Sequence, residues 1–114
     1  MSEAFEEIQL RYRRLALDWL AASGDAKRAN RIFKRHHTYY KEIRNTPDGQ
    51  YAIEGLLSDP VPEIRLLAAT HCLRIVPNAA VSVLEDLAAG TGRAAIDAIY
   101  TLESYRKGRL NLDW

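Results

Sequence analysis

The sequence predicts an all-α protein, and three observations support this fold class. Apolar residues recur at steps of three and four through most of the chain, which places them on single helix faces. No segment shows the strict alternation of apolar and polar residues that is typical of a half-buried strand. The breaks between the periodic segments are short, so we expect successive helices to be antiparallel neighbours.

Two long helices come first, over residues 3–22 and 26–44. Asp25 stands directly before the second helix, where its carboxylate can accept a hydrogen bond from a first-turn amide. Each helix has one apolar face, made of Phe5, Ile8, Tyr12, Leu15, Trp19 and Ala22 in the first and of Ala29, Ile32, Phe33, His36, Tyr40 and Ile43 in the second.

A turn and a short helix follow. Pro47 disfavours helical geometry at Thr46, so we place a turn there and a third helix over residues 50–57. Asp59 then serves as the predicted N-cap of the fourth helix, with Pro60 at its first position, where no backbone donor is missed.

The last two helices are separated by prolines and glycines. We expect Pro77 to end the fourth helix and to open a fifth over residues 78–89. Gly90-Thr91-Gly92 breaks the chain before a sixth helix over residues 93–107, which Gly108 ends. The residues expected to face inward on the sixth helix are Ile96, Ile99, Tyr100 and Leu102.

The segment over residues 56–73 reads LLSDPVPEIRLLAATHCL. A leucine-rich helix end, an Asp-Pro turn, an aliphatic-Arg pair, two alanines and a leucine follow in that order, and this pattern resembles a HEAT repeat. The resemblance implies that Asp59 and the next proline make a tight turn and that Arg65 bonds to neighbouring turns. It also implies that Ala68 and Ala69 let the next helix approach closely.

A weaker copy follows, in which Ile96, Ala98 and Leu102 correspond to Leu67, Ala69 and Leu73. We therefore expect a short right-handed solenoid of about three trimmed hairpins, the minimum for a stable stack. Periodicity alone also fits a closed bundle. The predicted single domain spans residues 1–114, with hairpins over 1–45, 48–76 and 77–108 and a tail over 109–114.

The second half of the chain also resembles a small bacterial family of HEAT-like proteins without an assigned activity. That resemblance implies a partner-binding or inhibitory role, of the kind that immunity proteins have towards toxins. The shared features are Asp59-Pro60, Ile64-Arg65, Ala68-Ala69-Thr70-His71, Pro77, Ala80, Leu84-Glu85 and Tyr105-Arg106-Lys107-Gly108.

Composition favours a soluble cytoplasmic protein. Of 114 residues, 47% are hydrophobic and 27% charged, values that are typical of one globular domain. Cys72 is the single cysteine and lies in an apolar run, so we expect it to be buried and reduced. No apolar stretch reaches the length of a signal peptide core or a membrane span.

Catalytic and metal-binding patterns are not apparent. His36 and His37 are adjacent, as are His71 and Cys72, so the side chains of each pair diverge on a helix. We expect His36 to be a core residue. Neither a phosphate-binding loop nor a nucleophile motif is present. The prediction is a protein that is not an enzyme and has no metal or cofactor; an enzyme of unrecognised type is the alternative.

The second helix carries the best functional candidate. Its polar side is strongly basic, with Thr38 and Tyr39 among the cations, and we expect it to line a concave surface with two more arginines at its border. The leading hypothesis is a protein partner with an acidic surface. A nucleic acid is the alternative partner, and a merely solvated face is the third interpretation. The candidate residues are Lys27, Arg28, Arg31, Lys34, Arg35, Lys41, Arg65 and Arg93.

Overall fold

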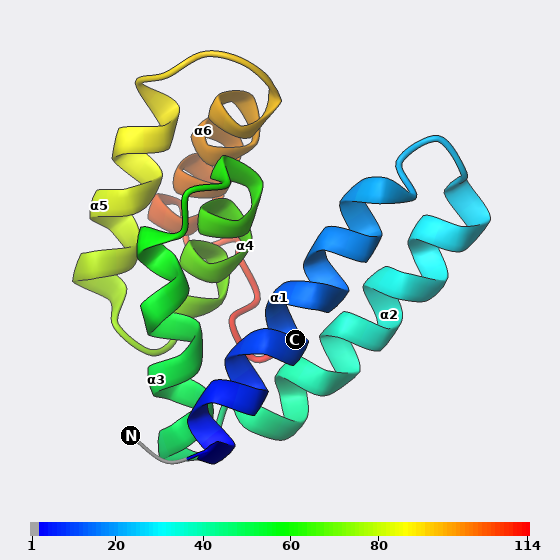
Figure 1. The fold of residues 1–114 in the computed structure, drawn as a ribbon. Helices are drawn as coiled ribbons and strands as arrows, with labels where there is room; N and C mark the ends of the chain where they lie inside the picture. Colours follow the sequence, from blue (N-terminus) through cyan, green and yellow to red (C-terminus); the bar gives the residue numbers. More distant parts are fainter. Residues whose placement is uncertain (1–2) are drawn as a thin grey trace. The chain divides into compact units, whose positions relative to one another are not determined.

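The computed structural model describes residues 3–114, and all the regular structure in this range is helical (Figure 1). This confirms the predicted all-α class. Six α-helices and one short 3-10 helix follow each other along the chain: α1 (Glu3–Ala21), α2 (Ala26–Ile43), α3 (Pro47–Gly55), η1 (Leu56–Ser58), α4 (Pro62–Cys72), α5 (Pro77–Ala88) and α6 (Arg93–Arg106).

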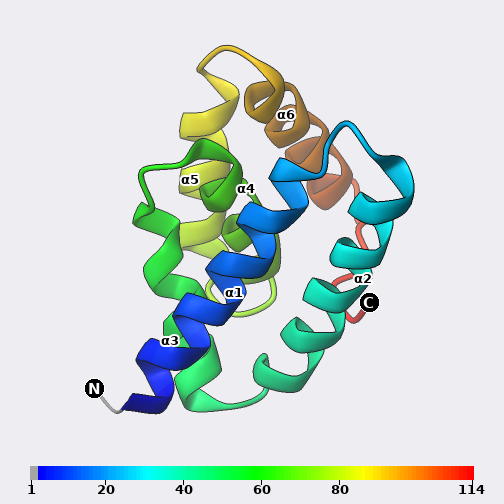
Figure 2. The ribbon, with the colours of Figure 1, turned by 45° about the vertical axis from the view of Figure 1, so that its right-hand side comes forward.

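The helices form two compact units, Met1–Gly55 and Leu56–Trp114. In the first unit, α1 and α2 run antiparallel side by side, and α3 packs mainly against α1 (Figures 1 and 2). Tyr12 and His36 meet edge to face across the hairpin, with ring centroids 4.3 Å apart. Gln9 of α1 donates a hydrogen bond to the Ala52 carbonyl of α3 at 3.0 Å, which attaches the third helix to the first.

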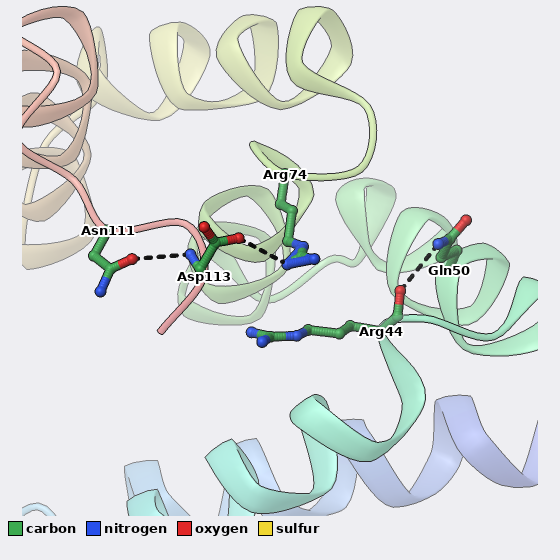
Figure 3. Close-up of polar contacts among 5 residues, drawn as sticks. All are labelled: Arg44, Gln50, Arg74, Asn111 and Asp113. Carbon is green, nitrogen blue, oxygen red and sulfur yellow. Dashed lines mark hydrogen bonds and ion pairs between the residues drawn. The ribbon is translucent and has the colours of Figure 1, made fainter.

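The turn between α2 and α3 is tighter than predicted, because Pro47 begins α3 instead of lying in a loop. Thr46 Oγ1 accepts a hydrogen bond from the Gly49 amide at 3.0 Å, as an N-cap does, and proline is well suited to the position that follows. Gln50 Nε2 donates to the Arg44 carbonyl at 3.0 Å and so satisfies a backbone group at the end of α2 (Figure 3).

In the second unit, α4, α5 and α6 pack against one another, and η1 packs on α4. Small side chains dominate their contacts, which lets the helix axes approach closely. Larger buried residues on these helices include Ile64 and Leu84, both fully buried. The buried alanines are Ala68 and Ala69 on α4, Ala80 on α5, and Ala94, Ala95 and Ala98 on α6.

The inward face predicted for α6 was largely wrong. Leu102 is buried, but Ile96, Ile99 and Tyr100 are 54%, 48% and 65% exposed. Alanines take the inward positions of α6, because only a small side chain fits where two helices approach closely. Side-chain size therefore decides this face, whereas apolar periodicity fits both sides of the helix.

The Asp-Pro boundary also differs in detail from the prediction. The helix α4 begins at Pro62 with Val61 as the N-cap, and it ends at Cys72 instead of continuing to the next proline. The Asp59 carboxylate accepts from the Val61 amide at 2.9 Å, so it stabilises the turn before the helix instead of the first helical turn itself. Arg65 donates to the Asp59 carbonyl at 2.7 Å and closes the same turn.

The tail after α6 folds back on its own unit. Gly108 ends the helix with a φ of 69°, in the left-handed region that favours glycine. The Asp113 amide donates to Asn111 Oδ1 at 3.0 Å, and the Asp113 carboxylate pairs with Arg74 at 3.3 Å (Figure 3).

Candidate functional site

The basic side of α2 is positioned by the N-cap and by the buried side of the helix. Asp25 Oδ1 accepts from the Arg28 amide at 3.1 Å, as predicted. Ile32, His36 and Tyr40 are buried, which leaves the rest of the helix surface exposed to solvent. The exposed cations on this surface are Lys27, Arg28, Arg31, Lys34, Arg35 and Lys41, which we call the basic face.

No side chain of the basic face has an ion-pair partner among residues 3–114. Glu42 is the only acid on α2, so the helix offers little internal neutralisation. Cations of the second unit do form ion pairs, as Arg106 does with Glu85 and Lys107 with Glu103. The basic face therefore keeps a positive potential that attracts anions.

A hollow of about 250 Å³ lies where the basic face meets α1. Three arginines from successive turns of α2 line it, and Asp18 of α1 is its single acid. The side chains of Leu15 and Ile32, nearly buried, complete the lining. The arginines are Arg28, Arg31 and Arg35, so three of the predicted residues share one hollow.

The two predicted residues that lie outside α2, Arg65 and Arg93, belong to the second unit. Arg65 is half-buried on α4, and its hydrogen bond to Asp59 gives it a role in holding the turn. Arg93 is the exposed first residue of α6, at the helix end where the dipole disfavours a cation.

Tyr39 does not belong to the polar side where the sequence placed it. Only 8% of its surface is exposed, and the Arg11 guanidinium lies 4.4 Å from the ring centroid. Burial raises the pKa of the Tyr39 phenol, an effect that the nearby arginine partly offsets. An aromatic ring at this position is buried because it adjoins the apolar stripe, next to Tyr40.

The charge pattern of α2 does not predict that α1 also lines the hollow. Asp18 and Leu15 line the hollow, and Arg11, Arg13 and Arg14 add cations to the same unit. The sequence does contain an indication of this, because Leu15 and Asp18 are three residues apart and so lie on the same side of α1.

Two other titratable candidates from the sequence, His36 and Cys72, are buried. His36 is buried, and desolvation lowers the pKa of its imidazole to about 4, although a hydrogen bond to the Tyr12 backbone opposes this shift. Cys72 is also fully buried, as predicted. Within residues 3–114, no three His, Cys, Asp or Glu side chains gather as metal ligands, and no helix is long and apolar enough to cross a bilayer.

Comparison with known proteins adds information about the fold. No protein-family model matches the chain, and no curated protein matches it. The structure is similar to the crystal structure of the protein RPA1889 from Rhodopseudomonas palustris CGA009, with a TM-score of 0.84 and 22% sequence identity. The match covers 94% of this chain and 92% of that chain. At this identity, the similarity shows a shared helical fold.

Proposed function

We propose that this chain is a non-catalytic protein-binding module that uses the basic face of α2 to hold an acidic surface of a partner protein. The observation that carries the proposal is that six exposed cations on one helix have no ion-pair partner within residues 3–114. Such a surface gains favourable contacts when it meets carboxylates, and it accelerates the encounter with them. An inhibitory or immunity-type role in the cytoplasm is the form of this function that we favour.

The HEAT-like assignment is part of the proposal. It is supported by the hydrogen bond from Arg65 to the Asp59 carbonyl, which is the contact that a HEAT arginine is expected to make with a neighbouring turn. The buried Ala68, Ala69 and Ala98 also agree with helices that stack closely, as in a solenoid of hairpins.

The test is quantitative affinity capture from the native organism at physiological salt, with three baits. Wild-type chain, Arg31→Glu and Arg109→Glu are compared, because the two variants change net charge equally and both positions are exposed. We expect Arg31→Glu to lose a protein that the wild type and Arg109→Glu both retain. If all three baits retain the same proteins in equal amounts, the basic face does not bind the partner.

A nucleic-acid partner is an alternative outcome of the same comparison. Phosphate contacts release counterions, so binding to a short duplex DNA or RNA would weaken steeply as salt increases. Tight, salt-sensitive binding to such a duplex that Arg31→Glu abolishes, together with no captured protein, would replace the protein-binding proposal.

A further inference from the structure

We infer that the hollow between α1 and α2 is a recognition subsite for an acidic helical segment whose carboxylates follow one another at intervals of three and four residues. The inference rests on the proposed function and narrows it to a ligand of defined spacing. Its starting point is that Arg28, Arg31 and Arg35 line one hollow together.

The spacing of the arginines selects the shape of the ligand. Arg28 and Arg35 are seven residues apart, which corresponds to about 10 Å along a helix axis. A single small anion can engage the guanidinium groups of neighbouring turns but not the whole row. A partner helix with carboxylates at positions i, i+3 and i+7 has the same rise and offers one carboxylate to each arginine.

The residue type and the lining determine the strength of the contact. A guanidinium presents a planar pair of N–H donors that fits a carboxylate, and such charge-assisted bonds are stronger than neutral ones. Leu15 and Ile32 are almost buried, so the surface that meets a ligand is mainly that of the three arginines and Asp18.

Asp18 makes the α1 side of the hollow negative, whereas the α2 side is positive. It is exposed on the α1 side and makes no ion pair within residues 3–114, so it repels an incoming carboxylate at that position. We therefore expect the partner helix to turn its carboxylates toward α2 and away from Asp18. This preference fixes the orientation of the partner helix in the hollow.

The test uses the full chain and two labelled synthetic helical peptides of identical composition. One places its glutamates at i, i+3 and i+7, and the other distributes them around the helix. Fluorescence anisotropy at physiological salt should show tighter binding of the first peptide. We expect Arg31→Ala and Arg35→Ala each to weaken it roughly 5-fold, and Lys41→Ala, a cation of α2 outside the hollow, to weaken it less than about 2-fold.

Two further variants test the planar guanidinium geometry and the charge inside the hollow separately from the overall charge and stability of the chain. Arg31→Lys keeps the charge but not the planar fork, so it should weaken binding by an intermediate amount, about 2-fold. Asp18→Asn removes the repulsive acid and should tighten binding about 2-fold, whereas Glu42→Gln, which removes an acid outside the hollow, should change it less. A gain of affinity cannot arise from misfolding.

Equal binding of the two peptides, or equal losses at Arg31 and Lys41, would overturn the subsite. Stronger competition by inorganic phosphate than by succinate, a dicarboxylate of similar charge, at equal ionic strength would overturn the carboxylate assignment in favour of a phosphoryl site. No binding of either peptide would also overturn the inference. The peptide results do not affect the affinity capture, in which loss of a protein from the Arg31→Glu bait tests the proposed function. The proposed function and the subsite can therefore fail independently.

Discussion

His36 couples folding of the first unit to pH. Its imidazole is buried against the Tyr12 ring, and desolvation lowers its pKa in the folded chain to about 4, against the ordinary value of 6.5. As the pH falls below 6.5, the unfolded chain binds a proton that the folded chain still rejects. The contribution to stability is therefore complete above pH 6.5 and is lost as the pH approaches about 4.

We expect His36 to reduce the free energy of unfolding by about 3 kcal/mol between neutral pH and the folded-state pKa. Urea titrations at successive pH values measure this change. In His36→Phe the step between pH 6.5 and about 4 should disappear, whereas His37→Gln should retain it. An unchanged pH dependence in His36→Phe would show that other groups cause the acid sensitivity.

At the scale of the element, the junction between α2 and α3 depends on a close backbone approach at Gly49. Gly49 lies in the first turn of α3, and a Cβ at this position would collide with the Ile43 carbonyl. Alanine usually stabilises a helix relative to glycine by about 1 kcal/mol, so the collision predicts the opposite sign.

Gly49→Ala should lower the unfolding midpoint, and we expect a loss of at least about 2 kcal/mol from the steric overlap. Gly24→Ala is the matched control, because open space surrounds the added Cβ there. Thermal melts followed by circular dichroism compare the two. A stabilised Gly49→Ala variant would mean that the junction is looser than the structure shows.

The inward alanines of α6 lead to a second prediction at the scale of the element. Ala98 is fully buried, whereas the neighbouring Ile99 is half exposed. Ala98→Leu should destabilise the chain by about 1–3 kcal/mol through overpacking. Ile99→Ala should cost less than about 1 kcal/mol, because about half of the residue is already exposed to solvent. A larger loss for Ile99→Ala than for Ala98→Leu in denaturant unfolding would restore the inward face that periodicity predicts.

Apolar periodicity was sufficient to predict six helices, and local signals such as the Asp25 cap, Pro77 at the start of α5 and Gly108 after α6 placed most of their ends. Periodicity failed where the size of a side chain or a local capping contact determines which residues lie inward or where a helix begins. The alanines of α6 lie inward because helices approach closely there, and Pro47 begins a helix because Thr46 caps it. Neither fact follows from hydrophobicity alone.

At the scale of the molecule, charge is unevenly distributed although its sum is only +1. The cations of α2 have no ion-pair partner within residues 3–114, whereas several in the second unit do. The sequence predicted which helix is basic, since a charge count suffices for that. It did not predict the hollow, which needs Asp18 and Leu15 of α1 beside α2.

This distribution predicts how binding responds to salt. Association of the captured partner with the wild-type chain should slow as ionic strength rises, because the steering field of the basic face is screened. Arg31→Glu should slow association at low salt and should show a weaker salt dependence, as measured by stopped-flow mixing. An association rate that is independent of salt would indicate a partner recognised by apolar contacts.

The most direct test of the binding surface is residue-resolved NMR of the full chain during titration with the peptide that has spaced glutamates. Amide shifts should change along α2 from Lys27 to Arg35 and around Asp18 of α1, and they should saturate together. Shifts that centre instead on the exposed Ile96, Ile99 and Tyr100 of α6, with α2 unaffected, would contradict the assignment of the binding surface to the basic face.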